Sequence, residues 1–176
     1  GIKELGFYEV VEAALGADIV ALAEAKELTE KGFLTSSCCP AFVSYVKKQF
    51  PDLAQYVSHN LSPMATIAKR IKQDDPTAKV IFIGPCTAKK MEFQKEEVVP
   101  YVDTVITFEE LQALFDSRDI EITELEEQPI ENASYYGRIF ARNCGLSEAV
   151  AEGLKEKGLE NFDLKAVPCD GIEACR

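Results

Sequence analysis

The stretch KVIFIGPC at residues 79–86 is an apolar run that ends at a glycine, a proline and a cysteine. Consecutive apolar residues bounded by polar and turn-forming residues are typical of a strand that is buried on both faces, as in a parallel sheet. In α/β proteins, functional loops follow the carboxyl ends of such strands. We therefore predict a buried strand over residues 79–83 that places Cys86 in a functional loop.

Two further cysteine segments share this arrangement. LTSSCCP at residues 34–40 and AVPCDGIEAC at residues 166–175 each follow or continue a short apolar run. Together the three segments hold five of the six cysteines. Thiols that are far apart in sequence and gather at strand ends can hold a soft metal or a cluster. The pattern therefore indicates a metal or redox site.

Apolar runs and amphipathic stretches alternate along the chain, which predicts an α/β layer architecture with a mainly parallel sheet. Proline and hydroxyl residues mark several expected helix starts, including a capping box at Thr107 and Glu110. We expect helices over residues 17–31, 40–50, 63–73, 108–115 and 138–157, the last broken at Gly145. We expect strands over residues 32–35, 79–83, 102–106 and 164–167, a short strand or early helix over residues 8–12, and a strand and a loop over residues 119–132.

The bulk composition restricts the partners of this 176-residue chain. Its formal net charge is −11, which argues against nucleic acid, because phosphate backbones demand a basic surface. No apolar run approaches a membrane span and no signal peptide is visible, so we expect a cytoplasmic protein. The chain begins at Gly1 and has a cysteine one residue from its end. We therefore expect it to be a piece of a longer protein.

Four cysteines are candidate ligands of one metal centre: Cys39, Cys86, Cys169 and Cys175. Four thiolates suit a 4Fe-4S cluster or a structural zinc. Zinc ligands usually come in close pairs, whereas five residues separate Cys169 from Cys175, so zinc is disfavoured. A plain thiol protein is the third alternative, because cysteine is often simply a core residue.

Two lysines follow the central cysteine segment. Lys89 and Lys90 come three and four residues after Cys86, near an expected helix start. The helix dipole makes a cation unfavourable there. The lysines either hold an anionic ligand or face water.

Several other polar residues have an ordinary interpretation. Glu24 and Glu27 lie one helical turn apart, and on pattern alone they fit a solvated acidic face. His59, the single histidine, is expected in an exposed loop. We expect Cys144 to be a small buried core residue rather than a ligand.

The three cysteine segments resemble the signatures of the iron-only (FeFe) hydrogenase large-subunit family. TSSCCPAF at residues 35–42 is similar to its Thr-Ser-Cys-Cys-Pro signature, PCTAKKME at residues 85–92 to the second, and residues 169–175 to the third. The order is that of the family, and the resemblance covers about residues 5–175. It implies that residues 1–176 are part of the catalytic domain, with two lobes, each a small, mainly parallel sheet flanked by helices, and a metal cluster in the cleft between them.

The resemblance implies an H-cluster, in which a 4Fe-4S cubane shares one cysteine sulfur with a di-iron unit carrying CO, cyanide and a bridging dithiolate. The implied cubane ligands are Cys39, Cys86 and Cys169, with Cys175 as the bridging fourth ligand. Further cofactor contacts are implied at Pro63, Met64, Gly84 and Pro85. Such clusters are oxygen-sensitive and the di-iron unit needs dedicated maturation, so we expect an aerobic preparation to lack them.

The resemblance also implies roles in proton transfer. Cys38 would pass protons to the bridgehead amine, and Lys89 would donate a hydrogen bond to an iron-bound cyanide. The path outward from Cys38 would run through Glu24, Ser58 and Glu27. Carboxylates suit this task because burial tunes their pKa values.

Three departures from the family pattern bear on function. Phe42 replaces a tryptophan, and Gly84 stands in place of a methionine, which we expect to open the pocket. The spacing between Cys169 and Cys175 widens from three intervening residues to five, so the bridging role of Cys175 stays open. This pattern is more similar to divergent, sensory members than to fast-turnover enzymes.

We interpret the chain as part of a ferredoxin-type FeFe hydrogenase that interconverts protons and H2. Its electron partner would be a ferredoxin or ferredoxin-like domains of the same polypeptide, and the isolated chain is expected to be inactive. One alternative is an H2 sensor with the same cofactor. Another is a cubane-only protein for electron transfer or iron–sulfur assembly. Cys38 and Lys89 argue against the latter, because they have no purpose without the di-iron unit.

Overall fold

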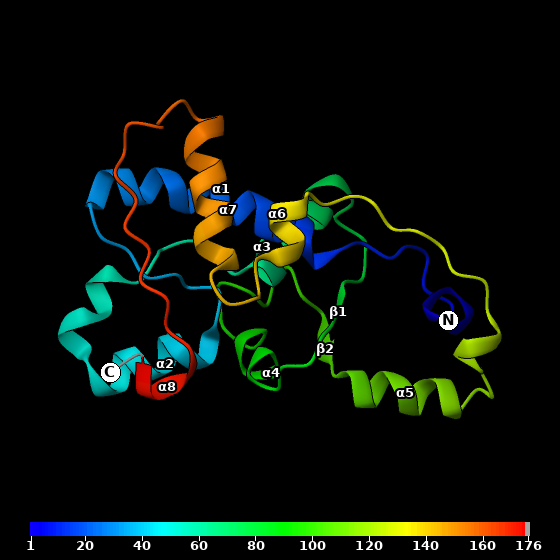
Figure 1. The fold of residues 1–176 in the computed structure, drawn as a ribbon. Helices are drawn as coiled ribbons and strands as arrows, with labels where there is room; N and C mark the ends of the chain where they lie inside the picture. Colours follow the sequence, from blue (N-terminus) through cyan, green and yellow to red (C-terminus); the bar gives the residue numbers. More distant parts are fainter. Residues whose placement is uncertain (175–176) are drawn as a thin grey trace. The chain divides into compact units, whose positions relative to one another are not determined.

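A computed structural model describes residues 1–174, so Cys175 lies outside the described residues (Figure 1). The chain divides into two compact units, the first made of residues 1–12 and 67–132 and the second of residues 13–66 and 133–176. The elements of the first unit are η1 (Ile2–Leu5), most of α3 (Pro63–Asp74), β1 (Ile81–Ile83), α4 (Ala88–Glu92), β2 (Thr104–Ile106), α5 (Phe108–Asp116) and η3 (Ile122–Glu124). Those of the second are α1 (Ala13–Lys31), α2 (Pro40–Gln49), η2 (Pro51–Tyr56), the start of α3, α6 (Tyr135–Ile139), α7 (Gly145–Glu156) and α8 (Gly171–Ala174).

The first unit contains a parallel two-stranded sheet, so the predicted mixed α/β class is confirmed. Ile81 lies opposite Thr104 in the register of β1 and β2. Both strands are shorter than predicted. Just before β1, the Val80 N–H donates to the carboxylate of Asp103 at 2.8 Å instead of to a strand carbonyl. Lys72 and Lys79 also bind Asp103, at 2.9 and 3.0 Å.

The predicted capping box at the start of α5 is confirmed. The Thr107 hydroxyl accepts the Glu110 N–H at 3.3 Å, and the Glu110 carboxylate accepts the Thr107 N–H at 2.8 Å. Two of the backbone donors at the helix start are satisfied in this way. The helix therefore begins directly after β2.

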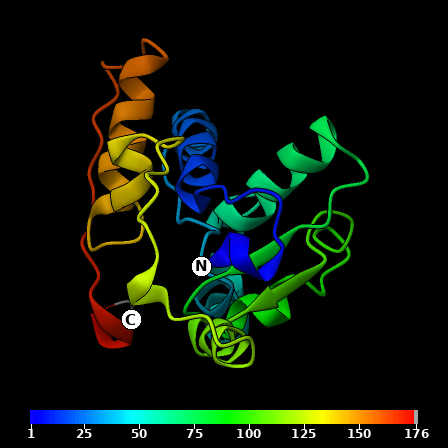
Figure 2. The same cartoon turned by 90° about the vertical axis from the view of Figure 1, so that its right-hand side faces the viewer.

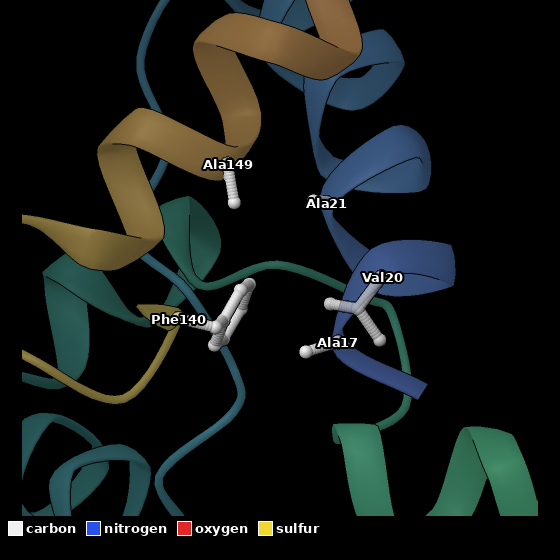
Figure 3. Packing of buried hydrophobic residues seen from close by; sticks show 5 residues of the cluster. All are labelled: Ala17, Val20, Ala21, Phe140 and Ala149. Atoms are coloured by element: carbon white, nitrogen blue, oxygen red, sulfur yellow. The ribbon is translucent and has the colours of Figure 1, made fainter. Parts of the chain in front are cut away.

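In the second unit, α1 packs against α6 and α7 (Figures 1 and 2). Phe140 follows α6, and Figure 3 shows its ring directed toward α1 and α7. The buried residues of this cluster are Ala17, Val20, Ala21, Phe140 and Ala149. Because most of them are small, the helices approach closely.

Several predicted strands are absent from the described residues. Residues 32–35 contribute only an isolated parallel bridge between Thr35 and Val57, and residues 8–12 form neither a strand nor a helix. Residues 119–132 hold a short 3-10 helix and irregular chain, and residues 164–167 are irregular, with Val167 79% exposed. Apart from the single bridge at Thr35, these segments pair with no strand of the described residues, and an unpaired strand is not stable in water.

The predicted helices are confirmed with shifts at their ends, except that residues 140–144 of the helix expected over residues 138–157 form a turn, which separates α6 from α7, and Gly145 begins α7. A β-carbon at Gly145 would lie 1.8 Å from the carbonyl oxygen of Ile139. The tight turn between the two helices therefore requires glycine. Among residues 1–174, no helix combines the length and apolarity that crossing a membrane requires.

Candidate functional site

Helix α1 carries the two carboxylates of the candidate site. Glu24 is 1% exposed, and the side chain of Glu27, one turn further on, is 12% exposed. The interpretation as a solvated acidic face is therefore wrong. Burying a carboxylate costs free energy unless polar partners compensate, so the contacts of these residues matter.

A backbone pairing brings two loops over this helix. The Thr35 N–H donates to the Tyr56 carbonyl at 2.8 Å, and the Ser58 N–H donates to the Thr35 carbonyl at 2.7 Å. The Ser37 hydroxyl donates to the Asn60 carbonyl at 2.5 Å and ties the same loops together. The pairing fixes the loop that leads to Cys38 beside the loop that carries Ser58.

Glu24 is bound from the cysteine loop. The Ser36 hydroxyl donates to Glu24 Oε1 at 2.7 Å. The same hydroxyl oxygen accepts the backbone N–H of Cys38 at 3.2 Å. Ser36 therefore joins the buried carboxylate to the segment that presents Cys38.

Glu27 is bound from the second loop and from the surface. The Ser58 hydroxyl and the Asn60 amide both donate to Glu27 Oε2 at 2.8 Å. Lys31 Nζ lies 2.7 Å from Glu27 Oε1, and His59 Nδ1 lies 3.1 Å from the same oxygen. The side chain of His59 is 79% exposed, as the sequence predicts. Glu27 therefore links the buried network to solvent.

The surroundings shift the pKa values of the two carboxylates in opposite directions. Burial raises the pKa of Glu24, which outweighs the hydrogen bonds from the Ser36 hydroxyl and the Ser37 backbone N–H that lower it. Burial also acts to raise the pKa of Glu27, but Lys31 and the Ser58 hydroxyl outweigh it, and the net pKa is lowered. Paired groups whose pKa values are pushed apart can serve as proton donor and proton acceptor.

The sequence pointed to Glu24, Glu27 and Ser58, and the structure brings these three together. The sequence did not point to Ser36, Asn60 or Lys31, which complete the network. Lys31 has a visible signal, because it follows Glu27 by four residues on one helix. Ser36 and Asn60 have none, because a loop pairing places them.

The adjacent cysteines have different surroundings. Cys38 is half-buried and packs against the cluster around Phe140. Cys39 is exposed, and its sulfur accepts the Phe42 N–H at 3.4 Å as the N-cap of α2. The expectation that the two thiols face different ways is consistent with these contacts.

The central cysteine segment lies in the first unit. Cys86 is half-buried between β1 and α4. Lys89 Nζ lies 2.6 Å from Glu92 Oε2, and Glu92 is buried, so the carboxylate fixes the ammonium group. Lys90 pairs instead with Glu110.

Gly84 does not leave an open space, contrary to the expectation from the missing methionine. The Phe82 ring lies 2.8 Å from the position that a β-carbon at Gly84 would take. Pro85 next to it is exposed. In the second unit, Met64 is 2% exposed and follows Pro63 at the start of α3.

The third cysteine segment provides Cys169, which is exposed. Cys144 is also exposed and lines the same pocket as Cys169, so the prediction of a buried core residue is wrong. It lies in the turn before α7, and its sulfur lies 3.5 Å from Asn143 Oδ1. Cys175, the expected bridging ligand, lies outside the described residues.

The donor set fits an iron–sulfur group in its chemistry. None of the five described cysteines is in a disulfide, and each expected cubane ligand among them has solvent access. Thiolates are the ligands that such clusters prefer. Within each unit, the part of the chain that is described holds no group of three His, Cys, Asp or Glu side chains able to bind a metal.

Comparison with known proteins agrees with the cysteine pattern and the fold. Residues 1–175 match the family model described as "Iron only hydrogenase large subunit, C-terminal domain", and the chain belongs to this family. Iron hydrogenase 1 of Clostridium pasteurianum is 27% identical over 94% of this chain. The apo [FeFe]-hydrogenase HydA1 from Chlamydomonas reinhardtii superposes on 74% of it with a TM-score of 0.64 and 30% identity.

The family also includes relatives with another name. The cytosolic Fe-S cluster assembly factor NAR1 of Botryotinia fuckeliana is 32% identical over 69% of this chain. The chain spans 33% of the Clostridium hydrogenase, 25% of this NAR1 and 38% of the Chlamydomonas structure. Family membership therefore does not decide between a hydrogenase and an Fe-S cluster assembly factor.

Proposed function

We propose that the chain is part of an FeFe-hydrogenase-type catalytic domain that binds an H-cluster and interconverts protons and H2, or senses H2. The observation that carries this proposal is the pair of carboxylates on α1: Ser36 of the Cys38 loop donates to Glu24, and Ser58 donates to Glu27 one helical turn further on. A buried carboxylate next to a second, solvent-linked carboxylate suits the transport of protons. A protein that only transfers electrons or assembles clusters has no chemical use for such a path.

In this proposal the thiolates of Cys39, Cys86 and Cys169 hold the cubane, and Cys175 remains the candidate bridging ligand. Contacts of Pro63, Met64, Gly84 and Pro85 with the cofactor belong to the same proposal. When bound, the H-cluster supplies the redox chemistry that joins protons and electrons into H2. Lys89 supplies a positive charge toward its anionic ligands, with Glu92 holding the ammonium in place.

Proton movement is assigned to residues of the second unit. The Cys38 thiol would be the innermost proton carrier, and the Ser36 hydroxyl, which donates to Glu24, would pass protons between that thiol and Glu24. Ser58 relays it to Glu27, whose partners Lys31 and His59 reach solvent. The raised pKa of Glu24 makes it a proton carrier, and the lowered pKa of Glu27 favours release at the surface.

The electron partner in this proposal is a ferredoxin or ferredoxin-like domains of the same polypeptide. We place the protein in the cytoplasm, as the name "cytosolic" states for the NAR1 relative. The second candidate function is a cubane-only role in iron–sulfur assembly, which the similarity to NAR1 favours.

Infrared spectroscopy distinguishes the H-cluster domain from the cubane-only protein. The full-length parent protein is matured anaerobically with the di-iron cofactor. We expect absorption bands from iron-bound CO and cyanide, and the turnover rate then distinguishes enzyme from sensor. A cubane without those bands would overturn the proposal in favour of the assembly or electron-transfer role.

A further inference from the structure

The second unit contains a pocket of about 400 Å³ that two cysteines share. Cys144 lines it from the turn before α7, and Cys169 lines it from the chain before α8. The two residues are 25 positions apart in the sequence, so the fold and not local spacing brings them to one cavity. Both side chains are exposed, and neither is in a disulfide.

The backbone at Cys144 is unusual for a cysteine. Its φ and ψ angles are 61° and −7°, in the left-handed region, where residues with a β-carbon other than Asn and Asp are uncommon. The side chain makes no capping hydrogen bond to α7. Glycine would satisfy this turn with less strain, so folding does not explain the thiol. Strained positions of this kind tend to occur at functional sites.

The other polar residues of the pocket carry charges of both signs. Arg142 and Asn143 line it next to Cys144, and Ser147 lies one turn into α7. Arg142 forms an ion pair with Glu148 at 3.1 Å. The pocket thus combines two thiols with the guanidinium of Arg142 and the carboxyl group of Asp170.

We propose that Cys144 is a thiolate ligand that acts with Cys169 in binding the iron–sulfur cluster, an inference that rests on the proposed function. The wide spacing between Cys169 and Cys175 leaves the fourth donor of the cluster open. Cys144 supplies a thiolate from the same pocket as Cys169. It therefore supplies the fourth thiolate of the cluster where Cys175 does not.

The first test asks whether the two thiols reach each other, and it needs no cluster. Phenylarsine oxide reacts with two neighbouring thiols to form two As–S bonds, and its oxygen leaves as water with the two thiol protons. The Cys175→Ser variant of the whole chain is treated with it and digested with trypsin, which separates residues 143–155 from residues 166–176. We expect one phenylarsenic group to join these two peptides. Recovery of the 143–155 peptide without arsenic would overturn the proposal.

The second test asks whether Cys144 binds the cluster. Wild type, Cys144→Ser and Ser147→Ala are reconstituted anaerobically with iron and sulfide, and iron, sulfide and the rate of iron loss to a chelator are measured. Ser147→Ala is the matched control, because it alters the same pocket without removing a thiol. We expect Cys144→Ser to lose iron at least about tenfold faster than the control.

The outcomes separate this inference from the function on which it rests. Equal iron, sulfide and chelator rates in Cys144→Ser and Ser147→Ala would overturn the role of Cys144 and leave the proposed function standing. A wild-type chain that takes up no iron and sulfide would overturn both.

Discussion

At the scale of the residue, Glu24 is a carboxylate kept inside the protein at a cost in stability. Glu24 is 1% exposed, and Ser36 Oγ donates a hydrogen bond of 2.7 Å to its carboxylate. Burial disfavours the charged form, so the pKa of Glu24 is raised. Natural proteins tolerate such costs where function requires them.

The first prediction concerns Glu24→Gln. The pKa of Glu24 is raised in the folded state. Its contribution to stability is therefore fully present below its unfolded pKa near 4.5 and is lost as the pH rises through its folded pKa. Glutamine keeps an acceptor for Ser36 without the charge. At pH 7 we expect the free energy of unfolding to rise by about 1 kcal/mol, with little change at pH 4. Urea unfolding at both pH values checks this, with Glu30→Gln on the exposed face of α1 as control. A loss of stability at pH 7 would contradict the claim that burial disfavours the charged form of Glu24.

Glu27→Gln is predicted to have the opposite effect. The lowered pKa of Glu27 means that its stabilising contribution is present above the unfolded value and is lost as pH falls through the folded value. The variant weakens the bonds from Lys31, Ser58 and Asn60. We expect a loss of about 1–2 kcal/mol at pH 7 that shrinks in acid, measured by the same unfolding curves. A gain in stability at pH 7 would show that these partners do not hold the carboxylate.

The carboxylates illustrate what the sequence can and cannot predict at this scale. Glu24, Glu27 and Ser58 are predictable by resemblance, and their helical spacing predicts a shared face. Their burial is not predictable, because it depends on loops that pair through Thr35 and Val57. Cys144 was predicted to be buried and is exposed, because a cysteine next to glycine gives no sign that the turn exposes it.

At the scale of the element, α1 is held by close contacts with α6 and α7. A β-carbon at Gly137 would lie 2.4 Å from the Ala14 carbonyl oxygen, and one at Gly153 would lie 3.1 Å from the Ala21 carbonyl oxygen. The first distance is too short for any β-carbon, and the second needs only a small shift. Gly137 therefore sets the approach of α6 to α1.

The third prediction compares the same substitution at these two glycines. Gly137→Ala should cost about 1–3 kcal/mol of unfolding free energy, because backbone atoms must move apart. Gly153→Ala should stay within about 1 kcal/mol of wild type, because alanine favours the helix while the contact tightens slightly. Thermal and urea unfolding of the two variants measure the difference. Equal stabilities would show that the helices can shift freely.

The helices were predictable from the sequence because their caps and periodicity are local. Pro40, Pro63 and the Thr107 capping box each mark a start that the structure confirms. Strands were less predictable, because an apolar run forms a strand only where a partner lies beside it. Residues 81–83 have such a partner in residues 104–106, whereas residues 164–167 have none in the described chain.

At the scale of the whole molecule, the candidate thiols are divided between two units, with Cys86 in the first and Cys39 and Cys169 in the second. Cys39 and Cys169 are exposed. Reaction sites of this kind work when water is excluded, because electrostatic interactions are then stronger. The chain also spans only a third of the Clostridium hydrogenase.

The fourth prediction follows from that exposure. The 176-residue chain alone, after anaerobic maturation, should evolve no H2 from reduced methyl viologen, while the full-length parent does. Gas chromatography of the headspace measures both samples. H2 evolution by the chain alone would show that the exposed thiols already form a working site.

The most direct test of the central claim, that the carboxylates of α1 move protons for H2 chemistry, is isotope exchange. The matured full-length parent is placed under H2 in D2O, and HD and D2 are followed by mass spectrometry, which needs no electron partner. We predict exchange in the wild type and a loss of about 100-fold or more in Glu24→Gln, with unchanged infrared bands and with Glu30→Gln at the wild-type rate. Exchange by Glu24→Gln at the wild-type rate would contradict the account.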